Sequence, residues 1–106
     1  MDYKVTGRDE DGVTQISLEA LESYKDKTLE LVILEGETTT FVFKDHTAYE
    51  ASGFCWGYRG EGPHGLHTAI RMFSDGIDED FNKTAISMLP MDKNWVWSFD
   101  SGFVHR

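Results

Sequence analysis

The chain has 106 residues, and its 10 Lys and Arg against 19 Asp and Glu give a net charge of −9. Such an acidic surface excludes non-specific binding to the phosphate backbone of nucleic acids, which requires a basic face. The single cysteine excludes an internal disulfide, and no apolar run approaches the ~20 residues of a membrane helix. We therefore expect one cytoplasmic domain that spans residues 1–106 and does not contact a membrane.

The first quarter of the chain predicts a β-hairpin followed by a short helix. Residues 3–5 have strand character, and Asp11-Gly12 suits the centre of a hairpin because both residues tolerate positive φ. Residues 13–16 would return as the second strand. Ser17 would then cap a helix over 18–22.

The next segment predicts a second hairpin. Residues 28–34 are rich in Leu, Val and Ile and read as a buried strand, and 35–37 contain the Gly of a turn. Residues 38–43 read Thr-Thr-Thr-Phe-Val-Phe, all residue types that favour strands, and should pair antiparallel with the first strand. Residues 45–56 lack clear periodicity and predict an extended or irregular connection.

The second half predicts two helices and a final strand. Pro63 suits a first helical turn, after which apolar residues recur at helical spacing until Asp75-Gly76 ends the helix. Asp78 to Asp80 favour a second helix start through the macrodipole, and Pro90 would stop that helix. Its apolar stripe is expected at Phe81, Ala85, Met88 and Leu89. With a last strand over 95–99, the predicted fold is α+β: a small antiparallel sheet packed against two helices.

A glycine-rich loop leads into the first of these helices and is the strongest candidate site. Backbone N–H groups at a helix start, next to glycines that allow close approach, favour an anion. Arg59 would add a bidentate donor, whereas Glu61 opposes a phosphate. The competing interpretation is a tight turn that only positions the helix. The candidate ligand-binding residues are Trp56, Gly57, Tyr58, Arg59, Gly60, Gly62 and His64.

Other candidate chemistries have weaker patterns. His64 and His67 could share a helix face and bind a metal with Cys55 or His46, but no Cys-x-x-Cys pair supports such a site. Cys55 with a histidine could act as a nucleophile, and residues 78–80 could hold a hard cation. Each has a simpler interpretation: Cys55 as a small core residue, the histidines as partly exposed polar side chains, and residues 78–80 as helix-capping charges. We therefore expect no catalytic residue, no metal and no cofactor.

Aromatic and acidic side chains suggest partners. Alternation places Trp95, Trp97 and Phe99 on one strand face, where they form either core or an aromatic platform. Residues 1–53 hold 12 acidic and 5 basic side chains, and such a surface could enter a basic groove of another protein.

The segment around the glycine-rich loop resembles a family of small uncharacterised proteins found in phages, plasmids and bacterial genomes. That family shares Gly-Phe-x-Trp-Gly-Tyr-Gly-Gly-x-Gly-Pro, then an amphipathic helix, a second helix, Leu-Pro and a Trp-containing end. Residues 53–97 follow this pattern, with Arg59 in place of a glycine. The resemblance implies a setting in mobile elements and their hosts, and no activity.

Two functions follow as expectations. The first is a non-enzymatic binding module that engages, and inhibits, a host or phage protein with a basic surface through acidic residues such as Glu19, Glu22, Glu35 and Glu37. The alternative is a protein that binds a nucleotide or another phosphate compound in the loop over 57–65. A hydrolase built on His64 and His67 is a third possibility, and the sequence leaves a homodimer open.

Overall fold

A mixed sheet covered by helices organises the chain. The computed structural model describes residues 2–73 and 79–105. The fold is α+β, as the sequence predicts, with a six-stranded sheet and three helices. In chain order the elements are β1 (Lys4–Arg8), α1 (Thr14–Glu22), β2 (Leu29–Glu35), β3 (Thr38–Phe43), β4 (Thr47–Ala51), α2 (Glu61–Phe73), α3 (Glu79–Met88), β5 (Trp95–Ser98) and β6 (Gly102–His105).

The sheet has the strand order β1-β4-β3-β2-β5-β6. The predicted hairpin is confirmed: β2 and β3 pair antiparallel from Leu29↔Phe43 to Glu35↔Thr38, around Gly36 at φ 60°. The connection expected over 45–56 contains strand β4, which pairs antiparallel with β3. A second C-terminal strand, β6, follows β5 and pairs with it around Gly102.

The predicted hairpin at Asp11-Gly12 is wrong. Gly12 does adopt a positive φ of 68°, but the chain then enters α1, which begins at Thr14 instead of after a second strand. Strand β1 instead pairs in parallel with β4, which makes the sheet mixed. Ser17, expected as a helix cap, lies inside α1 and is fully buried.

The Asp9 carboxylate explains this arrangement. It accepts hydrogen bonds from the Ser52 N–H at 3.0 Å, from Tyr49 Oη at 2.7 Å and from Ser17 Oγ at 3.0 Å. These donors come from β4, the residues after it, and α1. A carboxylate at the end of β1 therefore joins three segments and holds β1 next to β4.

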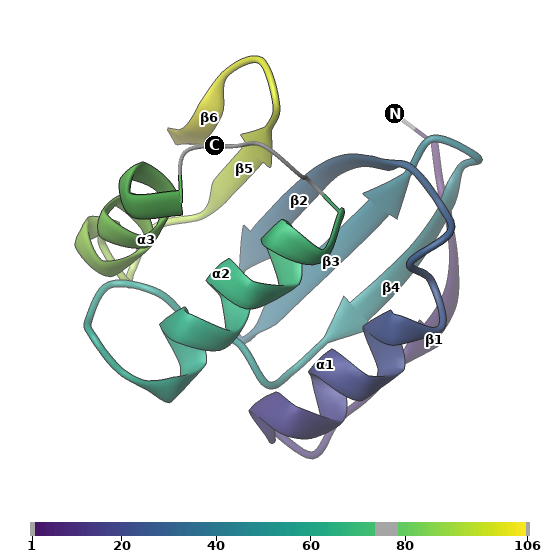
Figure 1. The fold of residues 1–106 in the computed structure, drawn as a ribbon, viewed down its shortest axis with the longest axis horizontal. Coiled ribbons are helices and arrows are strands. Elements are labelled where there is room, and N and C mark those ends of the chain that lie inside the picture. The colour runs from purple at the N-terminus through teal and green to yellow at the C-terminus, as the bar shows by residue number, and fades with distance from the viewer. Residues whose placement is uncertain (1, 74–78, 106) are drawn as a thin grey trace.

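All three helices lie on one side of the sheet (Figure 1). Their contact with it forms the main core, which includes Leu21 of α1, Ile70 of α2 and Ile86 of α3. Trp97 is also in this core, so this aromatic residue serves packing and not an exposed platform. A smaller apolar cluster of Ile33, Val42 and Ala48 lies on the opposite face of the sheet.

Helix α3 differs in detail from the prediction. It ends at Met88, before Pro90, as expected. Leu89, which follows the helix, is buried as predicted, whereas Met88 is 75% exposed and Ile86 is the side chain of this last turn that enters the core. The predicted helix stop at Asp75-Gly76, the start of the acidic cluster at Asp78 and the side chain of Phe81 lie outside the described residues. No helix in the described part of the chain is long and apolar enough to cross a membrane.

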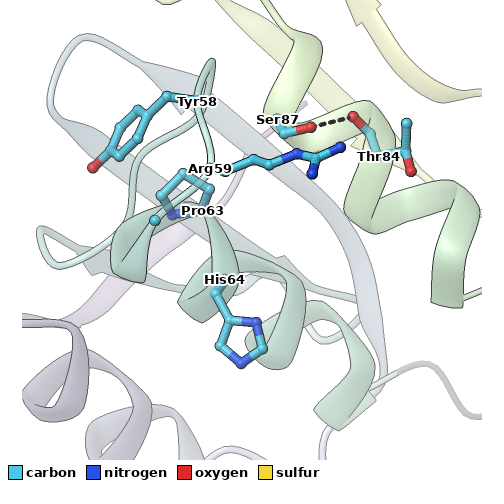
Figure 2. A pocket seen from close by; sticks show the side chains of 7 residues that line it. Tyr58, Arg59, Pro63, His64, Thr84 and Ser87 are labelled. Carbon is cyan, nitrogen blue, oxygen red and sulfur yellow. Dashed lines mark hydrogen bonds between the residues drawn. The ribbon is translucent and has the colours of Figure 1, made fainter.

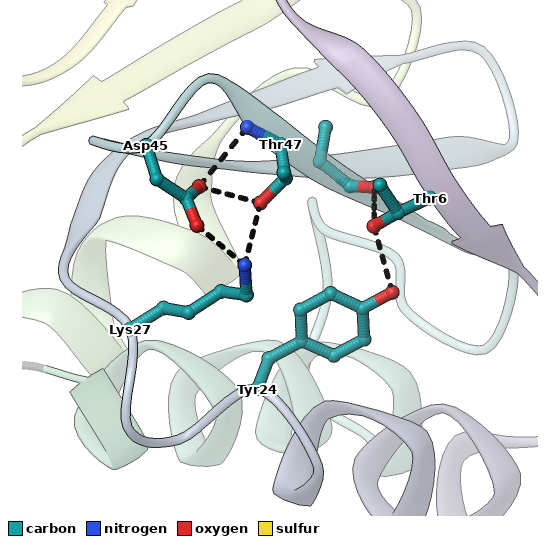
Figure 3. A network of polar contacts seen from close by, with 6 residues as sticks. Thr6, Tyr24, Lys27, Asp45 and Thr47 are labelled. Atoms are coloured by element: carbon teal, nitrogen blue, oxygen red, sulfur yellow. Dashed lines mark hydrogen bonds and ion pairs between the residues drawn. The ribbon is translucent and has the colours of Figure 1, made fainter.

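Polar contacts fix the end of α1 to the sheet (Figure 3). After the helix, Tyr24 Oη lies 3.0 Å from Thr6 Oγ1 of β1, and Lys27 Nζ donates to Asp45 and to Thr47 Oγ1. The Lys27 hydrogen bond, with those from Thr47, lowers the pKa of Asp45 to about 2. These bonds attach the α1–β2 connection to the turn between β3 and β4.

Candidate functional site

The glycine-rich loop is held in place by contacts that only glycine permits. Gly57 has φ 91°, and its N–H donates to the Ile86 carbonyl of α3 at 2.9 Å. A Cβ at Gly57 would lie 2.7 Å from the Leu89 carbonyl oxygen and 2.2 Å from Met91 Cγ. The loop therefore lies directly against the C-terminal end of α3, which no larger residue would allow.

Close packing continues into the first turn of α2. A Cβ at Gly62 would lie 2.0 Å from Cys55 Sγ. The same sulfur lies 2.9 Å from Tyr58 Oη. This hydrogen bond is the main cause of a raised pKa of Tyr58, and desolvation of the phenol is the second cause. The interpretation of the glycines as a tight turn is thus supported, since these glycines bring backbone and side chains into contact.

The exposed side chains of the same loop form a pocket. Its volume is about 380 Å³, within the range of small-molecule sites. Figure 2 shows the Arg59 side chain reaching from the loop toward α3, where Ser87 Oγ donates to the Thr84 carbonyl at 2.8 Å. The described residues that line the pocket are Tyr58, Arg59, Gly60, Pro63, His64, Thr84 and Ser87.

The described lining of the pocket is basic, in contrast to the acidic protein. Arg59 and His64 line it, and no carboxylate is among its described lining residues. Within the described part of the chain, the ion pairs join Arg8 to Glu50 and Lys27 to Asp45, so Arg59 has no acidic partner there. Glu61, which the sequence places in the loop as an opposing charge, lines a different cavity.

Three of the predicted site residues, Trp56, Gly57 and Gly62, do not line this pocket. Tyr58, Arg59, Gly60 and His64 do line it, whereas Trp56 is only 3% exposed and belongs to the core. Stacking of a ligand base on Trp56 is therefore excluded in this conformation. Tyr58, which is 43% exposed, is the aromatic face that a ligand can reach.

The predicted histidine pair is split between surface and interior. His64 is exposed in the pocket, whereas His67 is 3% exposed, and their ring centroids lie 6.5 Å apart. The described residues include no group of three or more His, Cys, Asp or Glu side chains arranged to hold a metal. His46 lies in the turn before β4 and does not line the pocket that contains His64.

Sequence reasoning missed the contribution of α3 to the pocket. Thr84 and Ser87 are three residues apart, so they lie on the same helix face, as neighbours at this spacing do. Two hydroxyls at that spacing are a common surface pattern, and only the packing of α3 beside α2 gives them a role.

Comparison with protein-family models, with curated proteins and with solved structures finds no significant match to this chain. The resemblance of residues 53–97 to the phage and plasmid family, and the host protein that it implies as a partner, therefore stay predictions.

Proposed function

We propose that this protein is a binding module for a small phosphate-bearing anion, which it holds in the pocket lined by Arg59. The observation that supports this proposal most is the pocket's charge. In a chain of net charge −9, the described lining offers a guanidinium, an imidazole and the hydroxyls of Tyr58, Thr84 and Ser87, without a carboxylate.

The chemistry of these groups suits a phosphate. A guanidinium without an acidic partner in the described part of the chain offers parallel N–H donors that match two phosphate oxygens, and such charge-assisted bonds are stronger than neutral ones. The exposed ring of Tyr58 at the pocket wall would accept a base by stacking, which favours a nucleotide over inorganic phosphate.

The experiment is a titration of the protein with adenosine monophosphate and with inorganic phosphate, followed by thermal stability and by amide chemical shifts. Millimolar ligand should stabilise the protein and shift the amides of the loop over 57–65. Arg59→Ala should weaken binding by about 10- to 100-fold, because it removes the charge-assisted hydrogen bonds.

Arg8→Gln is the matched control, since it also removes one positive charge but lies on β1, paired with Glu50. It should leave the affinity within about twofold, as expected of a screened surface charge. An equal loss of affinity in both variants, or no stabilisation by either ligand, would show that the pocket does not bind phosphate compounds.

A further inference from the structure

A second cavity lies on the other side of the glycine-rich loop and has the opposite charge. Its volume is about 750 Å³. Its walls come from segments far apart in the chain: the loop before α1, the β2–β3 turn, residues 52–56, the start of α2 and Met91. Among the described residues that line it, four are acidic and none is Lys, Arg or His. The acidic residues are Glu10, Asp11, Glu37 and Glu61. We call this cavity the acidic groove.

The acidic groove also collects exposed apolar side chains. Val13, Tyr58 and Met91 line it and are 42%, 43% and 61% exposed. Exposed apolar residues gathered in a concave surface with a polar rim are typical of sites that bind another molecule. The carboxylates alone would suit any cation, whereas these side chains favour an occupant with apolar groups between its charges.

One buried polar group in its wall lacks a partner. Trp56 lines the acidic groove, is nearly fully buried, and its Nε1–H has no hydrogen-bond acceptor in the described part of the chain. A buried donor without an acceptor costs free energy, so native structures rarely leave one. A peptide carbonyl would satisfy this N–H only if the groove wall opened on binding, because the Nε1 atom has almost no exposed surface in the free protein.

From the acidic charge of the groove and its exposed apolar side chains, we infer that the acidic groove binds a short segment of a partner protein in which Lys or Arg side chains flank an apolar residue. The basic side chains would meet Glu10, Asp11, Glu37 and Glu61, and the apolar one would pack on Val13, Tyr58 and Met91. A second copy of this chain is a poor occupant, because two molecules of net charge −9 repel each other. This inference shares Tyr58 with the phosphate pocket but uses none of that pocket's charged residues.

The test uses a fluorescein-labelled peptide of sequence acetyl-Lys-Leu-Lys-Lys-Leu-Lys-amide, with binding measured by anisotropy. A peptide with Glu in place of each Lys, and free spermidine as a competitor, complete the set of ligands. Binding of the Lys peptide should shift the amide resonances of Gly12, Gly36 and Gly62 and the indole N–H of Trp56. It should also weaken when the salt concentration rises.

The decisive variant neutralises three exposed rim residues: Glu10→Gln, Asp11→Asn and Glu37→Gln. It should raise the Kd of the Lys peptide about tenfold, as three exposed charge pairs would. The matched control, Asp2→Asn with Asp26→Asn and Asp100→Asn, removes the same charge from exposed positions outside the groove and should raise the Kd about twofold or less.

Met91→Ser tests the apolar contact without a change of charge and should raise the Kd about threefold. Three outcomes would overturn the inference: equal losses in the rim and control variants, resonance shifts outside the groove, or spermidine that binds while the Lys peptide does not. The last result would show a site for free polyamines and not for a protein segment.

Discussion

The two sides of the glycine-rich loop differ in charge although they share a wall. Tyr58 lines both the Arg59 pocket and the acidic groove. Arg59 and Glu61 are only two residues apart, yet Arg59 lines the first cavity and Glu61 lines the second. The fold thus separates opposite charges that would otherwise neutralise each other, so each cavity keeps its own electrostatic preference.

The loop therefore has two separate roles, one in the packing of the backbone and one in the chemistry of the cavities. The glycines fix the path of the backbone against α3 and α2, and the side chains between them point to the two cavities.

The largest effect is expected from Gly57→Ala. The new methyl group would meet the Leu89 carbonyl and Met91 at a residue with φ 91°, so we expect a loss of about 3–4 kcal/mol in the free energy of unfolding. Urea unfolding measures this loss. Gly36→Ala is the control, because Gly36 has a similar φ but open space around it, and it should cost about 1–2 kcal/mol. Equal losses would show that φ alone, and not the contact with α3, requires glycine at position 57.

The separation of charges predicts different responses to Arg59→Glu. This variant should lower the affinity for adenosine monophosphate by about a hundredfold, because it replaces charge-assisted bonds by repulsion. The anisotropy of the labelled Lys peptide should remain within about twofold of the wild type, since Arg59 does not line the acidic groove. If both affinities change strongly, the two cavities act as one site.

Asp9→Asn should affect the acidic groove more than the Arg59 pocket. Asp9 positions the chain just before Glu10 and Asp11, and loss of its charged hydrogen bonds should lower the free energy of unfolding at pH 7 by about 1–3 kcal/mol. Affinity for the Lys peptide should fall together with this stability, and affinity for adenosine monophosphate should change less.

The pH dependence of the same variant gives an independent check. Desolvation raises the pKa of Asp9, but hydrogen bonds from Ser52, Tyr49 and Ser17 outweigh it and lower the pKa below the ordinary 3.8. The stability that Asp9 contributes is therefore complete above pH 3.8 and is lost as the pH falls through the lower pKa of the folded state. The wild type should be more stable than Asp9→Asn at pH 7, and the gap should narrow as the pH falls below 3.8. A gap that widens in acid would contradict this account.

The smallest effect is expected from His64→Gln. Its side chain lines the Arg59 pocket from the first turns of α2, where it would donate one hydrogen bond to the proposed anion. Affinity for adenosine monophosphate, measured by calorimetry, should fall about threefold. A loss as large as that of Arg59→Ala would instead make the imidazole a principal ligand of the anion.

Local patterns in the sequence predicted the elements whose partners are near in the chain. The hairpin of β2 and β3 follows from two runs of strand-forming residues around a turn glycine, and helix α2 follows from Pro63 in its first turn and apolar residues at helical spacing. The parallel pairing of β1 with β4 did not, because Asp9 and Ser52 are 43 residues apart and no local period links them. Asp11-Gly12 does turn the chain, and the sequence alone could not tell a turn into a strand from a turn into a helix.

In the candidate site, too, local sequence patterns account for some features and long-range packing for the others. The sequence by itself determined that residues 57–65 are rich in glycine, carry Arg59 and His64, and lead into a helix, since these are properties of neighbouring residues. Only the tertiary structure decided that Trp56 is buried while Tyr58 is exposed, and that Thr84 and Ser87 complete the pocket. It also decided that Arg59 and Glu61 line opposite cavities. The physical reason is that burial and electrostatic environment depend on the packing of α3 and distant turns against the loop, and periodicity within a segment contains no information about that packing.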